Sequence, residues 1–215
     1  MEDSTIDAPS KLQTGKLISQ IFSVLFHPML MPVLGIFLIF NSGSHLSFMP
    51  FEAKRAIYIT VFLTTCVLPI SLLPLLYQFK VIKSFNMQTS RERLWPIIFT
   101  ALFNYLGLWL LKKMGLSGVL QNFILGTLVA LFVAGVISAF WKVSLHMMGI
   151  GGVTGVILAL GLRYNLDIAF LFSGLVLASG LTGASRLYLG AHTPAQIYVG
   201  YFIGFGVICG AVLFY

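Results

Sequence analysis

The sequence predicts an all-α protein, a polytopic membrane helical bundle with six or seven transmembrane helices. Of its 215 residues, 58% are hydrophobic and only 9% are charged, whereas a soluble domain carries about 25% charged residues. The mean hydropathy is +0.96. A spanning helix needs about 20 mostly apolar residues, and the chain contains enough apolar runs for six or seven of them.

We expect two parts, a polar N-terminal tail over residues 1–16 and a single transmembrane domain over residues 17–215. The tail opens with acidic and polar residues, whereas a signal peptide opens basic and then turns apolar. The net charge of +7 comes from cations in the loops, which suits anionic lipid head groups or an anionic substrate. We expect no nucleic-acid partner, because there is no soluble basic domain to bind one.

Short polar breaks between the apolar runs set the expected spans. The first run, residues 17–40, is interrupted by His27, Pro28 and Pro32. Either all of it spans with a kink, or residues 17–26 lie in the membrane interface and a short helix follows. The later spans are expected at residues 56–79, 95–111, 118–140, 147–162, 168–183 and 194–215.

Three polar breaks, at residues 80–93, 141–146 and 184–193, are predicted to lie on one membrane face. Successive breaks are separated by a pair of spans, which returns the chain to the face it left. Together the breaks carry six of the 13 lysines and arginines and two of the four histidines. The three breaks can contribute to one site only if they lie on the same membrane face. With the cations proposed for the site set aside, the charge split between the two faces favours neither membrane orientation.

The third break has the pattern of an anion site at a helix start. Thr193, Pro194 and Gln196 read as an N-cap, a first-turn proline and the partner of a capping box. His192 therefore precedes a helix N-terminus, where an anion is favoured by about 0.3–1 kcal/mol. Arg186 offers a planar fork suited to phosphate oxygens. The alternative is an arginine that reaches lipid head groups beside a hydrogen-bonded interface histidine.

The second break places Lys142, Ser144 and His146 at alternate positions, which share a face in an extended segment; in a helix, Lys142 and His146 do. A histidine there can protonate a leaving alkoxide near neutral pH. The alternative is an interfacial lysine beside a hydrogen-bonded histidine. The first break supplies cations that either bind phosphate or belong to a solvated basic loop: Lys80, Lys83, Arg91 and Arg93.

These breaks match three motifs of a known family to different degrees. The third motif, Ser-Arg, five residues, His, three residues, Asp, is matched from Ser185 to His192, with Gln196 in place of the Asp. The second, Pro-Ser-Gly-His, retains Ser144 and His146. The first, Lys, six residues, Arg-Pro, is loose, because Arg93 is followed by proline only three positions later and no lysine precedes it at the usual spacing.

On these residues the chain resembles the type 2 phosphatidic acid phosphatase superfamily, membrane lipid phosphatases that share a helical core with vanadium haloperoxidases. The resemblance covers roughly residues 80–215. It implies that His192 attacks phosphorus and forms a phosphohistidine, and that His146 protonates the leaving oxygen and then activates water. It also implies that Arg186 is a catalytic residue that neutralises the phosphate, and that the phosphate-binding residues are Arg93, Arg91, Ser144 and Ser185. From its place beside Ser144, we expect Lys142 to bind phosphate in place of the missing first-motif lysine.

The family Asp orients the nucleophilic histidine, and Gln196 can do so only through an uncharged carbonyl oxygen. No metal or other cofactor is implied, since the six acidic residues are scattered. We expect an integral multi-pass protein of a bacterial-type inner membrane that hydrolyses phosphorylated or pyrophosphorylated lipids. The alternative is a weakened or inactive lipid-phosphate binder or transporter of the same fold. An unrelated small-solute transporter would need polar residues near the bilayer midplane, and the spans offer few.

Overall fold

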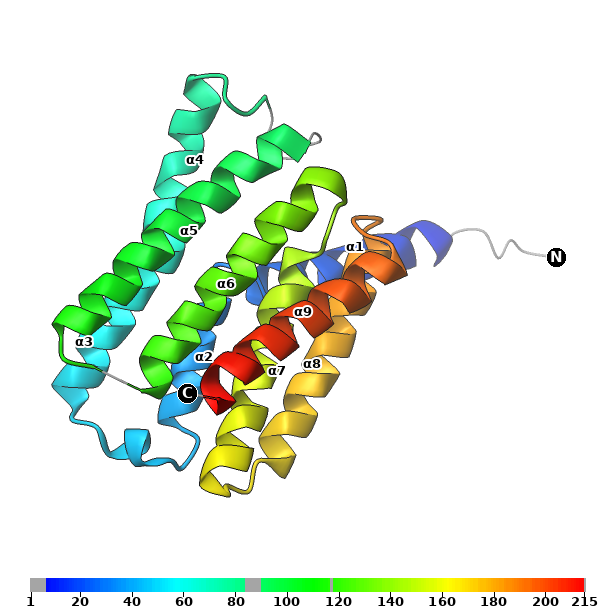
Figure 1. Cartoon of the computed structure of the whole chain (residues 1–215). Coiled ribbons are helices and arrows are strands. Elements are labelled where there is room, and N and C mark those ends of the chain that lie inside the picture. Colours follow the sequence, from blue (N-terminus) through cyan, green and yellow to red (C-terminus); the bar gives the residue numbers. More distant parts are fainter. Residues whose placement is uncertain (1–6, 84–89, 117, 215) are drawn as a thin grey trace.

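The computed structural model describes residues 7–83, 90–116 and 118–214 (Figure 1). Within these residues the secondary structure is helical, with a 3₁₀ turn at His45–Phe48 and a π-helical turn at Leu63–Val67. The α-helices are α1 (Asp7–Leu25), α2 (Met31–Phe40), α3 (Phe51–Phe62), α4 (Leu68–Gln78), α5 (Ser90–Lys113), α6 (Val119–Phe140), α7 (Leu145–Tyr164), α8 (Ala169–Tyr188) and α9 (Pro194–Leu213).

The prediction of an all-α membrane bundle is confirmed. In the described part of the chain, six helical segments are long and apolar enough to cross a membrane: Phe51–Gln78, Leu94–Lys113, Val119–Phe140, Leu145–Tyr164, Ala169–Tyr188 and Pro194–Leu213. The first of these joins α3, the π-helical turn and α4 into one span. The protein is an integral multi-pass membrane protein.

The first apolar run divides into two helices that meet at a proline-containing turn. A residue that precedes proline is disfavoured in helical conformation, and α1 ends two residues before His27-Pro28. Pro32 lies in the first turn of α2, where its missing N–H costs nothing. With 10 residues α2 is about 15 Å long, half the hydrocarbon thickness of about 30 Å. It is therefore too short to span, and of the two alternatives for this run the structure agrees with the one that has a short second helix.

Three expected boundaries differ from the structure. Helix α1 begins at Asp7, so the expected limit of the tail at residue 16 falls inside a helix. Helix α5 begins at Ser90, so the last residues of the expected polar loop are helical. Ser144 accepts a hydrogen bond from the Met147 N–H and caps α7, which places His146 in the first helical turn and not in the break.

The centre of the bundle is a close parallel pair, α7 and α9. Their starts are joined by the Ser144 N–H, which donates to the backbone carbonyl of Gln196 at 3.3 Å. Their ends are joined by the Arg163 guanidinium, which donates to the Val212 carbonyl at 3.1 Å. Glycines allow the approach: a Cβ on Gly200 would lie 2.6 Å from the Ser144 carbonyl oxygen. Small residues serve this purpose between membrane helices.

The other helices surround this pair in a way that gathers the polar breaks at one end. Helix α6 packs on α9 and on α5, and α8 packs on α7. Figure 1 shows the α6–α7 and α8–α9 connections together with the end of α4 and the start of α5 at the same end of the bundle. Helix α1 crosses this end and contacts α8. The arrangement agrees with the prediction that the three polar breaks lie on one membrane face.

Gly204→Ala is expected to destabilise the protein by about 1–3 kcal/mol, as overpacking typically does. A Cβ at this position would collide with the Met148 carbonyl of the neighbouring helix. Gly206→Ala on the same helix is the control, because a Cβ there meets no atom within 4 Å. Melting temperatures in detergent check the difference, and equal melting of the two variants would contradict the close α7–α9 contact.

Candidate functional site

Two histidines and an arginine from distant segments meet at the end of the bundle where α7 and α9 begin. His146 lies in the first turn of α7, His192 immediately precedes the N-cap of α9, and Arg186 lies in the last turn of α8. His146 and His192 line one cavity of about 480 Å³. Arg186 and His192 are both close enough to His146 to interact with it electrostatically. Helix N-termini favour anions, so this end suits a phosphate.

Gln196 fixes the protonation of the His192 ring. Its side-chain Oε1 accepts a hydrogen bond from the Thr193 backbone N–H at 3.1 Å and lies 3.1 Å from His192 Nδ1. A backbone amide can only donate, so the shared atom must be the carbonyl oxygen. That oxygen cannot donate, so the proton lies on Nδ1. In the neutral ring Nε2 of His192 therefore carries no proton.

The turn between α8 and α9 sets the position of His192 relative to Arg186. Gly190 has a φ of +62°, in the left-handed region that glycine adopts without strain. The Gly190 N–H donates to the Leu187 carbonyl, and the Ala191 N–H donates to the Arg186 carbonyl at 3.1 Å. This pair of bonds is a Schellman motif, which ends the helix and turns the chain back.

Arg186 reaches toward α1 and retains an unused donor. Its NH1 donates to the Ser23 hydroxyl at 3.2 Å. Its Nε is buried and has no hydrogen-bond partner. A buried donor without a partner costs free energy, and each such group in a native structure calls for an explanation. An oxyanion bound at this position would supply the missing acceptor.

Ser23, near the end of α1, contacts both His146 and Arg186. Its carbonyl oxygen lies 3.1 Å from His146 Nε2. A carbonyl can only accept, so in neutral His146 this nitrogen carries the proton. Ser23 therefore presents one oxygen to the histidine and a second to the arginine. A phosphoryl group bound here would offer oxygens to the same two partners.

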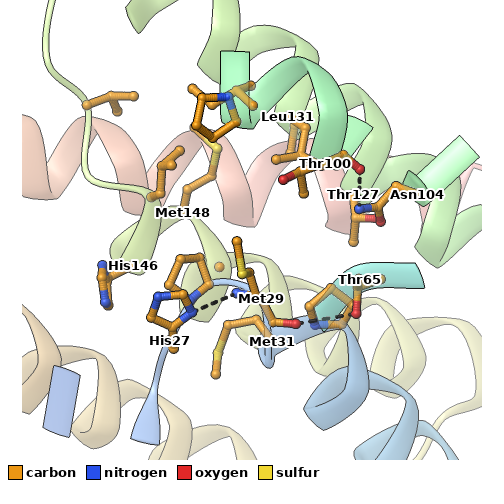
Figure 2. Close-up of a pocket in the computed structure, with 18 of the residues that line it drawn as sticks. His27, Met29, Met31, Thr65, Thr100, Asn104, Thr127, Leu131, His146 and Met148 are labelled. Carbon is orange, nitrogen blue, oxygen red and sulfur yellow. Dashed lines mark hydrogen bonds between the residues drawn. The ribbon is translucent and has the colours of Figure 1, made fainter. Parts of the chain in front are cut away.

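A third histidine, His27, belongs to this cluster and was not predicted as a site residue. Its ring packs edge-on against that of His146, with 5.4 Å between centroids and an angle of 82° (Figure 2). Its Nδ1 accepts from the Met29 N–H at 3.4 Å, so the proton of the neutral ring lies on Nε2. Burial, and secondarily the Arg186 charge, lower the pKa of His27. The signal in the sequence was a histidine–proline pair within an apolar run.

The remaining predicted residues have varied positions. The hydroxyl of Ser144 is fully buried and accepts from the Met147 N–H, while that of Ser185 is buried and donates to the Leu181 carbonyl at 2.8 Å. The Ser144 hydroxyl caps α7, and the Ser185 hydroxyl is satisfied by the backbone of its own helix. Lys142 is exposed and lines the cavity. The side chains of Arg91 and Arg93 lie outside the described residues.

Polar side chains also line the inner part of the cavity, which the sequence did not predict. Asn104 donates to the Thr100 carbonyl at 2.9 Å and accepts from the Thr127 hydroxyl at 3.3 Å. Figure 2 shows these three residues on the side of the cavity away from His27 and His146. In the described part of the chain, no group of three or more His, Cys, Asp or Glu residues has a geometry that could hold a metal ion.

Comparison with known proteins gave no match, whether against protein-family models, curated proteins or solved structures. The family resemblance therefore rests on the motif residues themselves.

The stability of the protein is expected to fall as the pH is lowered below about 6.5, the ordinary pKa of histidine. Burial lowers the pKa of His27 in the folded protein, so below that pH the unfolded chain binds more protons than the folded one. Above it both states are neutral at this position and the contribution is constant. His27→Gln should therefore flatten the acid side of a plot of melting temperature against pH. His45→Gln, at the other end of the bundle, is the control, and an unchanged slope in His27→Gln would contradict the assignment.

Proposed function

We propose that the protein is a membrane phosphohydrolase that removes phosphate from phosphorylated or pyrophosphorylated lipids through a phosphohistidine intermediate. The observation that carries the proposal is the His192 ring, whose Nδ1 is held by Gln196 and whose Nε2 is left unprotonated. This nucleophile stands at a helix N-terminus in the same cavity as His146. We propose that it acts in a bacterial-type inner membrane.

In the first step the Nε2 lone pair of His192 attacks phosphorus, and the bond from phosphorus to the lipid oxygen breaks. The negative charge of the bound phosphoryl group favours the protonated form of His146. Protonated His146 gives its Nε2 proton to the departing oxygen, which becomes a lipid hydroxyl or a lipid monophosphate. The leaving oxygen takes the place of the Ser23 carbonyl, which accepts from that nitrogen in the present structure. The first products are the released lipid and phosphohistidine.

In the second step water attacks the phosphorus of the phosphohistidine. His146, now neutral, accepts a proton from this water, and the bond between phosphorus and His192 breaks. Inorganic phosphate leaves and both rings return to their starting states. One histidine thus acts as acid and then as base, which is how a single residue serves both halves of a double displacement.

Charge stabilisation comes from Arg186 and from the helix N-termini. Phosphoryl transfer depends mostly on positioning and on neutralising the equatorial oxygens. The unpartnered Nε of Arg186 and its NH1, released from Ser23, form a fork for two of these oxygens. Lys142, Arg91 and Arg93 are proposed to add positive charge. Ser144 supports the site by capping α7, which carries His146.

A second candidate is a non-catalytic binder or transporter of lipid phosphates. Two observations favour it. Gln196 has no charge to stabilise a protonated His192, and Ser23 already accepts hydrogen bonds from His146 and Arg186. Such a protein would bind lipid phosphates and never form phosphohistidine. Formation of the covalent intermediate therefore separates the two candidates.

His192→Ala is expected to abolish phosphate release and phosphohistidine formation, because it removes the nucleophile. The measurement combines phosphate release from a panel of lipid phosphates with acid-quench detection of labelled phosphohistidine. His45→Ala is the matched control, since His45 packs on Tyr164 at the opposite end of the bundle. Phosphate release by His192→Ala at the wild-type rate would exclude His192 as the nucleophile. Lipid binding by wild-type protein without phosphohistidine would favour the binder.

Gln196 is a positioning residue, and its role is separable from simple helix capping. Gln196→Leu removes the oxygen that orients His192 and should lower kcat about 10²-fold, the scale of a misplaced reacting group. Gln196→Glu retains the oxygen and adds a charge that favours the protonated ring. The acid limb of its kcat profile should therefore move to higher pH. A capping role alone would leave the pH profile of Gln196→Glu unchanged.

A further inference from the structure

The cavity extends well beyond the residues proposed for phosphoryl transfer. His27, His146 and His192 line it, and Figure 2 shows His27 and His146 at one end with Thr100, Asn104 and Thr127 of α5 and α6 away from them. Between the two ends its walls are mostly apolar side chains from α2, α4, α5, α6 and α7. Hydrolysis of a phosphate ester would not by itself require this inner space.

The depth of the cavity follows from the helices that line it. Along α5, Asn104 lies eight residues beyond Pro96, a rise of about 12 Å. Along α6, Thr127 lies 11 residues from Ser138, a rise of about 16 Å. Half the hydrocarbon thickness of a bilayer is about 15 Å. The cavity therefore extends from the histidine end to about the middle of the membrane at Asn104 and Thr127, and about 6 Å further to Phe123.

The inner end is walled by buried side chains. Phe123 is 1% exposed and faces Gly35 of the short helix α2, where a Cβ would collide with its ring. The Asn104 amide also lines the cavity, is 1% exposed, and is held by Thr100 and Thr127. A hydrocarbon chain that enters from the histidine end meets an aromatic ring and a polar amide there.

We propose that this cavity binds one linear hydrocarbon chain of the phosphorylated lipid and limits its length. A volume of about 480 Å³ lies within the range of about 300–1,000 Å³ that is usual for a pocket holding one small ligand, so the cavity has room for one hydrocarbon chain. The phosphoryl end at the histidines rests on the proposed function. The preferred substrate class is therefore a single-chain alkyl or isoprenyl phosphate and not a two-chain glycerolipid.

Alkyl phosphonates test this without turnover, because their carbon–phosphorus bond is not hydrolysed by the proposed chemistry. Binding of a series of increasing chain length to detergent-solubilised protein is measured by native mass spectrometry, with a two-chain phosphonate for comparison. Affinity is expected to rise with chain length and then to fall beyond a cut-off. The two-chain compound should bind at least about tenfold more weakly than the best single chain. Equal binding of all lengths, or stronger binding of two chains, would overturn the proposal.

Two variants should move the cut-off in opposite directions. Ala130 is buried and lines the cavity on α6, so Ala130→Leu should shorten the longest chain accepted. Phe123→Leu removes part of the inner wall and should lengthen it. Ala139→Leu, an exposed position on the same helix, is the matched control and should change nothing. If Ala130→Leu fails to fold, Phe123→Leu still decides, and an unmoved cut-off there overturns the proposal.

Failure here and failure of the proposed function give different results. A length cut-off for phosphonates with no hydrolysis of any phosphate ester would support the chain site and reject catalysis. Hydrolysis of esters through phosphohistidine without any length preference would support catalysis and reject the chain site.

Discussion

The close parallel contact of α7 with α9 is the constraint on which the rest of the structure depends. Two membrane helices that run in the same direction present their N-termini at the same face, and the glycines allow their backbones to approach closely. A hydrogen bond from the Ser144 N–H to the backbone carbonyl of Gln196 fixes their register at that end. As a result, the first turn that carries His146 and the residue that precedes α9 face one cavity. The positive ends of two helix dipoles are added at this point.

A small number of hydrogen bonds then decides what this end of the bundle can do. Gln196 uses one oxygen both to cap α9 and to set the His192 tautomer, so the stability of the helix and the reactivity of the ring are coupled. Ser23 holds His146 and Arg186 with two of its own oxygens. The end of α1 therefore occupies the positions that a phosphoryl group takes in the proposed function, in which substrate binding would displace it.

Much of this arrangement was predictable from the sequence, because it follows from local patterns and counting. Alternating spans place three polar breaks on one face whatever the details of packing. The Thr193, Pro194 and Gln196 pattern defines a helix start, and the spacing of His192 from Gln196 brings the two side chains together. The helical start of α5 at Ser90 was missed, since a run of charged residues was read as loop.

Contacts between distant segments were not predictable in the same way. His27 lies in a turn that reads only as an interruption of an apolar run, and its contact with His146 exists because the short helix α2 packs on α7. Thr100, Asn104 and Thr127 are isolated polar residues within apolar helices. Thr100 and Asn104 lie one turn apart on α5, and the packing of α5 against α6 brings Thr127 to them on one cavity wall.

The central claim is that His146 and His192 contact one phosphoryl group at one membrane face. Its most direct test is ¹⁵N NMR of histidine-labelled protein during titration with orthovanadate, a phosphate analogue, with signals assigned from single histidine substitutions. The His146 and His192 signals are expected to shift together and to saturate with one dissociation constant, while the His45 signal stays unchanged. A shift of only one of the two, or of neither at saturating vanadate, would contradict it.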